Sequence, residues 1–436
     1  MKRYAIIGTG ARAIMYRDAL TTTYAESCTL QALCDQNPLR MAAFQPNPEN
    51  PLPSYGPDDL EKMIQEQSID EVIVTTMDSA HHEFICRAME AGCDVITEKP
   101  MTTDSEKCHQ ILEAIDRTGR QLRVTFNYRY APRNSKVKEV LQSGAIGEIL
   151  SVHFEWLLDT KHGADYFRRW HRDKANSGGL LVHKSTHHFD LMNWWLSSTP
   201  ETVFALGGLH FYGKVNATQR GEARDYERAT GTPEAADDPF ALDLSKDPEL
   251  KKLYLDCEAD DGYLRDQNVF GEGISIEDDL AVSVRYKSQA TLSYHLTAYS
   301  PCEGYRVAFN GTKGRLELNV VESAYVSGKS DDHNFSKNVK GTADHAVEEP
   351  TTLTLQRHWE KPQTLGIDQA NAGGHGGADT IMLRDLFAPD QMNDPLGRAA
   401  GHIDGALSIL TGIAANQSIK TGQAVAVKSL VPSLFV

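Results

Sequence analysis

A glycine-rich turn near the start constrains the fold of this 436-residue chain more than any other feature. Residues 4–7 read YAII, and Gly8 to Ala13 then follow the pattern GxGxxA before a helical pattern begins. A strand, a tight turn and a helix in this order aim backbone N–H groups at an anion, and the positive helix end favours a pyrophosphate there. The turn predicts a dinucleotide site, although such glycines also occur in purely structural turns.

An acidic residue at the end of the next predicted strand supports the dinucleotide site. Asp35 follows the apolar run 30–34 and lies about 25 residues beyond Gly10, where a carboxylate accepts both ribose hydroxyls. The same carboxylate repels a ribose 2′-phosphate, which favours NAD. Because Arg40 nearby could accommodate that phosphate, NADP stays possible.

Strand and helix patterns alternate over residues 1–125. The apolar run 71–76 is typical of a strand buried on both faces, and residues 81–92 read as a helix closed by Gly92. The strand DVIT and the turn EKP come next, at 94–100. This alternation predicts a parallel sheet with helices on both sides.

The pattern changes over residues 126–436. A helix is expected over 136–148, and another over 399–416. Longer strands with alternating apolar and polar positions are expected at 149–159, 277–286, 290–299 and 315–323, which predicts an antiparallel sheet with one face on a core. Residues 213–272 and 323–350 are acidic and too long for ordinary connections, so we expect insertions around a site.

Charge and composition exclude several classes of protein. The formal net charge of −16 argues against nucleic acid or an anionic membrane as the main partner. No run of 18 apolar residues could span a bilayer, and glycines and an arginine break the N-terminal apolar stretch. The seven cysteines are scattered without a CxxC motif and are expected to be reduced. We therefore expect a cytoplasmic protein.

These motifs together resemble the Gfo/Idh/MocA oxidoreductase family over nearly the whole chain. The resemblance rests on GTGAR at 8–12, CDQNPLR at 34–40, TTMDSAHH at 75–82, AGCDVITEKP at 91–100, FNYRY at 126–130, SGAIGEI at 143–149, GGLLVHKSTHHFDL at 178–191 and FNGTKGRLEL at 309–318. It implies an N-terminal Rossmann domain, residues 1–125, and a C-terminal α/β domain, residues 126–436, on a large, mostly antiparallel open sheet. It also implies a homodimer or homotetramer formed through that sheet.

Two residues match the chemistry that the resemblance implies, which is oxidation of a sugar, glycoside or cyclitol hydroxyl by NAD(P). Such a reaction needs a base for the hydroxyl proton and a cation for the developing alkoxide. Lys99 lies in the EKP turn at the carboxyl end of a predicted parallel strand, where ligands bind, although it could be a solvated turn lysine. His187 matches the family's catalytic histidine, and an ordinary histidine pKa near ~6.5 suits proton transfer.

The remaining site residues are predicted from the loop and from the resemblance. Those expected to contact the cofactor are Gly8, Thr9, Gly10, Ala11, Arg12, Asp35, Arg40, Thr76, His81, Glu98, Asn127 and Trp170. Those expected to contact the substrate are Tyr128, Arg129, Arg169, His183, Lys184 and His375. The stretch YFRRWHR at 166–172 suits a sugar ring, but could be a surface loop, and GGHGGAD at 373–379 could line a pocket or only turn the chain.

The chain departs from the family pattern at two places. Met77 stands where a proline usually follows Thr76, and His183 stands where the family helix usually has an aspartate. His183 and His187 share a helical face with Asp190, which could hold zinc, but the adjacent Lys184 disfavours a metal and we predict none. A structural histidine pair or a proton relay are the other interpretations. His188 is expected to be structural.

Three functions remain open. The first is a dehydrogenase that transfers a hydride between NAD(P) and a hydroxyl of a small carbohydrate. The second is a redox glycosidase, in which bound NAD oxidises a ring position transiently and so permits elimination of the glycoside. The third is a non-catalytic NAD sensor. Net NADH with a keto-sugar distinguishes the first function from the second, and Lys99→Ala distinguishes an enzyme from a sensor.

Overall fold

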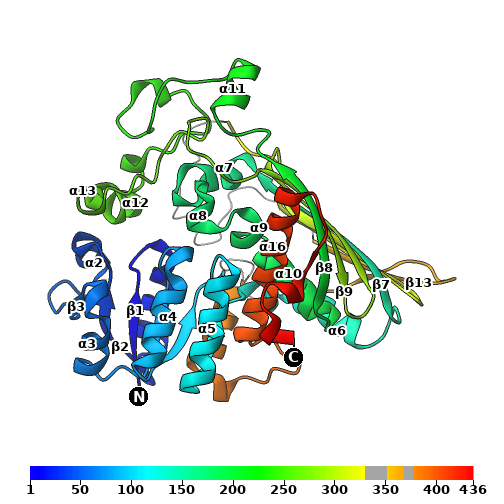
Figure 1. Ribbon diagram of the computed structural model, residues 1–436, viewed down its shortest axis with the longest axis horizontal. Coiled ribbons are helices and arrows are strands. Elements are labelled where there is room, and N and C mark those ends of the chain that lie inside the picture. Colours follow the sequence, from blue (N-terminus) through cyan, green and yellow to red (C-terminus); the bar gives the residue numbers. More distant parts are fainter. Residues whose placement is uncertain (329–350, 368–376, 436) are drawn as a thin grey trace.

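The N-terminal part of the protein is built on a six-stranded parallel sheet (Figure 1). The computed structural model describes residues 1–328, 351–367 and 377–435. The order of the strands in the sheet is β3-β2-β1-β4-β5-β6. The strands are β1 (Lys2–Ile7), β2 (Cys28–Cys34), β3 (Ser54–Tyr55), β4 (Glu71–Val74), β5 (Asp94–Thr97) and β6 (Leu122–Val124). All neighbouring pairs are parallel, as predicted.

Both faces of this sheet are covered by helices. In β1, Ile6 packs in one apolar cluster with Tyr16 and Met41, whereas Ile7 packs in another with Met63. Since side chains alternate along a strand, the two clusters lie on opposite faces. The helical elements are η1 (Ala11–Ala13), α1 (Ile14–Asp18), η2 (Ala19–Thr23), α2 (Pro38–Phe44), η3 (Pro57–Asp59), α3 (Leu60–Glu66), η4 (Asp78–Ala80), α4 (His81–Glu90) and α5 (Ser105–Thr118).

A nine-stranded sheet forms the rest of the architecture, in the order β14-β13-β12-β11-β7-β10-β9-β8-β15. Only the β7–β10 pair is parallel, so the prediction of a mostly antiparallel sheet is confirmed. The strands are β7 (Ile149–Asp159), β8 (Pro200–Gly208), β9 (Asp279–Tyr286), β10 (Thr291–Ser300), β11 (Glu303–Gly311), β12 (Gly314–Ser323), β13 (Thr352–Arg357), β14 (Gln363–Leu365) and β15 (Val425–Ala426).

Helix α16 (His402–Thr421) ties the two sheets together. Near its start, a Cβ on Gly405 would lie 2.9 Å from the sulfur of Met101, close to β6. Farther along, a Cβ on Gly412 would lie 2.2 Å from the carbonyl oxygen of Leu181, so glycine is needed for close packing on α9 (Leu180–His183). The other helical elements are η5 (Asn127–Tyr130), α6 (Pro132–Gln142), α7 (Thr160–Arg168), η6 (Trp170–Arg172), α8 (Lys174–Ser177), α9 (Leu180–His183), α10 (Thr186–Leu196), α15 (Ala378–Phe387), η12 (Pro389–Gln391), η13 (Val427–Ser429) and η14 (Pro432–Phe435).

The predicted insertion at 213–272 folds back onto the first sheet. It contains α11 (Lys214–Arg220), η7 (Pro233–Ala235), η8 (Leu244–Lys246), α12 (Pro248–Leu253), η9 (Leu255–Cys257) and α13 (Glu258–Asp261). Figure 1 shows α12 and α13 beside α2, and Leu250 and Tyr254 join the apolar cluster of Tyr4 and Met41. The insertion therefore shares a core with the Rossmann sheet.

Some predictions fall outside what the structure describes. Of the second predicted insertion, 323–350, the structure describes only residues 323–328. The division at residue 125 stays a prediction. No helix among the described residues is both long and apolar enough to cross a membrane.

Candidate active site

The turn after β1 requires glycine for two reasons. Gly8 has a φ of +90°, and a Cβ there would lie 2.8 Å from backbone atoms of Thr75 and Thr76, which follow β4. A side chain would be both strained and blocked. Beyond Gly10, the N–H of Ala11 donates a 2.9 Å hydrogen bond to the hydroxyl of Tyr254, which comes from the insertion.

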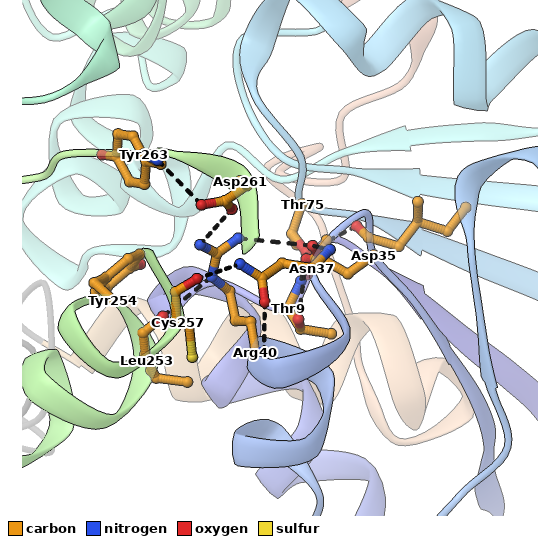
Figure 2. A network of polar contacts seen from close by, with 12 residues as sticks. Thr9, Asp35, Asn37, Arg40, Thr75, Leu253, Tyr254, Cys257, Asp261 and Tyr263 are labelled. Carbon is orange, nitrogen blue, oxygen red and sulfur yellow. Dashed lines mark hydrogen bonds and ion pairs between the residues drawn. The ribbon is translucent and has the colours of Figure 1, made fainter. Parts of the chain in front are cut away.

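Asp35 is fixed at the end of β2 by the same turn (Figure 2). Its Oδ2 accepts hydrogen bonds from the N–H and hydroxyl of Thr9, at 2.7 and 3.0 Å, and its Oδ1 accepts one from the N–H of Asn37 at 2.9 Å. Arg40 lies 3.6 Å from the carboxylate. A glycine turn that only glycine fits, followed by a fixed carboxylate at the end of β2, is the arrangement that a dinucleotide requires. These residues therefore fit NAD.

Glu98, just before the predicted catalytic lysine, is a buried anion with several donors. Arg12 and the hydroxyl of Tyr16 both bind its Oε1, at 2.6 and 2.7 Å, and the N–H of Lys99 donates to its Oε2. Burial alone would raise the pKa of Glu98, but Arg12, Tyr16 and Lys99 outweigh it and hold the pKa below its usual value. Glu98 thus anchors the EKP turn to η1 and α1.

Lys99 meets His183 across the junction of the two sheets. The ammonium nitrogen donates to the carbonyl oxygen of His183 at 3.2 Å and lies 3.5 Å from its Nε2. On the other side of the imidazole, Nδ1 lies 2.5 Å from Oδ2 of Asp78, at the start of η4. Asp78, His183 and Lys99 therefore form a continuous line of polar contacts.

Burial shifts all three pKa values toward the uncharged forms. It lowers the pKa of Lys99 to about 8, with Lys184 adding to the effect while Asp78 and Glu98 oppose it. It also lowers the pKa of His183 well below its usual value and raises that of Asp78. A lysine with a pKa of about 8 can exchange a proton near neutral pH.

The second predicted catalytic residue, His187, lies in an aromatic stack. Its ring is parallel to that of Tyr128, with ring centres 4.2 Å apart. The hydroxyl of Tyr128 accepts a 3.2 Å hydrogen bond from Lys184, whose ammonium lies 4.8 Å from the centre of the Trp156 ring. His188 stacks on Trp156 and contacts the hydroxyl of Tyr294 at 2.7 Å. The convergence of Lys99 and His187 on one substrate atom stays a prediction.

Two arginines predicted to contact substrate are held by carboxylates. Arg129 is 2% exposed and binds Asp190 at 2.5 and 2.8 Å and Asp404 at 2.8 Å. Arg169 binds Asp165 at 2.7 Å. The contacts of Arg129 give it a structural role between η5, α10 and α16.

Three other predicted site residues, Trp170, His81 and Asn127, also have defined contacts. Trp170 stacks on His171, whose ring also meets that of His183. His81 contacts the carbonyl oxygens of Pro100 and Thr76 at 2.8 and 3.2 Å and so links two strand ends. Asn127 donates to Asp379 at 2.8 Å, and its buried Oδ1 has no partner among the described residues. His375 lies outside the described residues.

Three residues near the site were not predicted from the sequence. Asp78 lies inside the motif TTMDSAHH, and the presence of a carboxylate in that motif could have marked it as a site residue. From the insertion, Tyr254 reaches the dinucleotide turn and Asp261 reaches Arg40 on α2, and no local pattern marks either residue. Within the described ranges, no three metal-binding side chains gather in one place, and the absence of a metal stays a prediction.

Comparison with known proteins agrees with the geometry. Residues 2–126 match the model described as "Oxidoreductase family, NAD-binding Rossmann fold", and residues 138–427 match "Oxidoreductase family, C-terminal alpha/beta domain". The oxidoreductase YteT of Bacillus subtilis is 34% identical over 449 aligned positions, which cover 99% of each chain. Inositol 2-dehydrogenase 2 of Saccharopolyspora erythraea is 32% identical over 144, which cover 33% of this chain and 40% of that protein.

A solved structure shares the fold. The WlbA dehydrogenase of Bordetella pertussis, in complex with NADH and UDP-GlcNAcA, has a TM-score of 0.62 and 17% identity, with 98% of each chain covered. The two family models together span most of the chain, and the model that matches residues 2–126 describes an NAD-binding domain. The protein is therefore an NAD-binding oxidoreductase that belongs to the Gfo/Idh/MocA family.

Proposed function

We propose that the protein is a dehydrogenase that transfers a hydride between NAD and a secondary hydroxyl of a sugar, glycoside or cyclitol. The observation that carries the proposal is the line of contacts from Lys99 through His183 to Asp78 beside the dinucleotide turn. The name of the related inositol 2-dehydrogenase supports a polyhydroxylated substrate. When bound, NAD supplies the hydride acceptor.

Lys99 is the proton acceptor in this proposal. A hydride leaves a carbinol carbon readily only as the hydroxyl proton is removed, so a base must touch the hydroxyl oxygen. Burial lowers the pKa of Lys99 to about 8, which leaves a useful neutral fraction at mildly alkaline pH. His187 would contact the same hydroxyl, and the aromatic rings of Tyr128 and Trp170 suit a sugar ring.

Asp78 would be the final acceptor of that proton. The hydroxyl proton passes to Nζ of Lys99, a proton passes from Nζ to Nε2 of His183, and the Nδ1 proton of His183 passes to Oδ2 of Asp78. Lys99 and His183 end uncharged, and Asp78 ends protonated. Burial favours these uncharged forms, since it raises the pKa of Asp78 and lowers those of Lys99 and His183.

The redox glycosidase is the second candidate, because it begins with the same hydride transfer from a ring position to NAD. Tyr254 of the insertion accepts a hydrogen bond from the N–H of Ala11, a donor that a pyrophosphate also needs, so NAD must displace this hydroxyl when it binds. Glycoside cleavage without net NADH would identify this activity.

Exposed apolar side chains on the large sheet support a homodimer or homotetramer. Leu206 on β8 is 63% exposed, and Phe204 on the same face is 39% exposed. Apolar side chains in such positions are typical of subunit interfaces. We place this oligomer in the cytoplasm. Light scattering coupled to gel filtration would measure its mass, and a monomer would contradict this part of the proposal.

A substrate screen tests the proposed activity. Inositols, free sugars and glycosides are incubated with the protein and NAD, and the absorbance of the reduced nicotinamide and the release of free sugar are followed together. Net NADH with a keto product supports the dehydrogenase, and sugar release without net NADH supports the glycosidase. Tight NAD binding with neither reaction would contradict both.

A further inference from the structure

The insertion places a carboxylate against Arg40, the arginine that lies beside Asp35. We propose that Asp261, together with Asp35, holds Arg40 between two carboxylates and so makes the site select NAD against NADP. Asp261 lies at the end of α13, far from the Rossmann segment in sequence. The inference concerns cofactor binding alone and does not depend on the proposed substrate.

Three hydrogen bonds attach the insertion to the loop that follows β2 and to the helix α2 that comes next (Figure 2). The side-chain nitrogen of Asn37 donates to the carbonyl oxygen of Cys257 at 2.8 Å. Arg40 donates from Nε to the carbonyl oxygen of Leu253 at 3.1 Å, and from Nη2 to Oδ2 of Asp261 at 2.7 Å. The insertion is thus fixed to the loop that carries Asp35, where the ribose is read.

The three charged groups are all buried. The side chains of Arg40, Asp35 and Asp261 are 8%, 8% and 6% exposed. Burial alone would raise the pKa of Asp261, but Asn37, the N–H of Tyr263 and Arg40 outweigh it and lower that pKa. Burial opposes the charge of Arg40 as well, but Asp35 and Asp261 together raise its pKa. The group therefore carries two negative charges and one positive charge.

This arrangement disfavours a 2′-phosphate. A site for NADP needs a cation whose donors are free to reach the phosphate. In this chain Nε and Nη2 of Arg40 already donate to Leu253 and Asp261, and the guanidinium charge is shared between two carboxylates. A phosphate would meet a net negative charge with little solvent to screen it. An NAD ribose brings no such charge.

Binding measurements with matched variants test the inference. The dissociation constants of NADH and NADPH are measured by nicotinamide fluorescence for the wild type, Asp261→Asn and Asp260→Asn. Asp260 is exposed on the same helix, so its variant makes the same change in net charge without the contact to Arg40. We expect Asp261→Asn to improve NADPH binding relative to NADH by about tenfold, or about 1.4 kcal/mol. Asp260→Asn should change this ratio less than twofold.

Two results would overturn the inference. The first is an unchanged ratio in Asp261→Asn, and the second is an equal change in both variants, which would mean a general charge effect. If Asp261→Asn unfolds in a thermal scan, Asp261→Ser, which also removes the carboxylate from Arg40, is measured in its place. NADPH binding that fails to improve at least twofold relative to NADH in that variant would overturn the inference as well.

Discussion

Nδ1 of His183 lies 2.5 Å from Oδ2 of Asp78, which joins an imidazole of α9 to a carboxylate that follows the fourth strand of the Rossmann sheet. The family pattern has an aspartate where this chain has His183. In this chain Asp78 places a carboxylate beyond the imidazole of His183, at the far end of a line of polar contacts that begins at Lys99.

Replacing Asp78 with asparagine should change the pH profile as well as the rate. Asparagine keeps an acceptor for His183 but removes the negative charge that raises the pKa of Lys99. That pKa then falls, so the rising limb of kcat/KM for oxidation should move to lower pH, while the plateau should drop about 10²-fold for lack of the final proton acceptor. Asp58→Asn, at an exposed position, is the control. An unshifted limb would mean that Asp78 is only structural.

Replacing Lys99 should remove turnover without removing the cofactor. We expect Lys99→Met to lower kcat by about 10²–10⁴-fold and to keep NAD binding within about threefold in a fluorescence titration. In the wild type, oxidation should rise with pH through about 8, because the lysine accepts a proton only when neutral. A wild-type profile that is flat between pH 7 and 9 would count against Lys99 as the base.

Removing Arg129 should lower the stability of the protein and should not act through substrate contact. Arg129→Ala leaves Asp190 buried and unpaired, and such a loss costs about 3–5 kcal/mol of unfolding free energy. Burial raises the pKa of Asp190 to about 7 even with Arg129 present. Chemical denaturation measures the loss, with exposed Arg120→Ala as the control. A normal stability with a raised KM would instead assign Arg129 to the substrate.

Alanine substitutions at two glycines with nearly equal φ values should distinguish the effect of backbone strain from that of steric blocking. Gly8 and Gly92 have φ of +90° and +94°, but a Cβ would meet the backbone of Thr75 only at Gly8. Gly92→Ala should cost about 1 kcal/mol in a denaturation experiment. Gly8→Ala should cost more and should weaken NAD binding at least tenfold. Equal effects on NAD binding would contradict the role given to the turn.

Local patterns predicted most of the fold. The glycine turn, the run 71–76 and the alternation of β7, β9, β10 and β12 are short-range signals, and each identified an element at its observed place. The strands β8 and β11 were not predicted, although β11 pairs with both β7 and β12. Strand position in a mixed sheet depends on partners distant in sequence, which local periodicity does not report.

The sequence predicted which residues belong to the site better than it predicted the contacts that they make. Lys99 and His183 were chosen from motifs, and the structure brings them together. Arg129 was predicted from the resemblance, and Arg40 because an arginine near Asp35 could accommodate a ribose 2′-phosphate, but carboxylates of this chain already hold both. Those partners, Asp190, Asp404 and Asp261, come from other segments, so only the folded structure could show them.

Isotope transfer tests hydride exchange between a hydroxyl-bearing carbon and NAD most directly. An active inositol, sugar or glycoside deuterated at its carbinol carbons is incubated with the protein and NAD, and the nicotinamide is examined by mass spectrometry. Deuterium should appear at C4 of the ring with the wild type and be nearly absent with Lys99→Met. If the protein binds NAD, converts the substrate and leaves the nicotinamide unlabelled, the proposed chemistry is wrong.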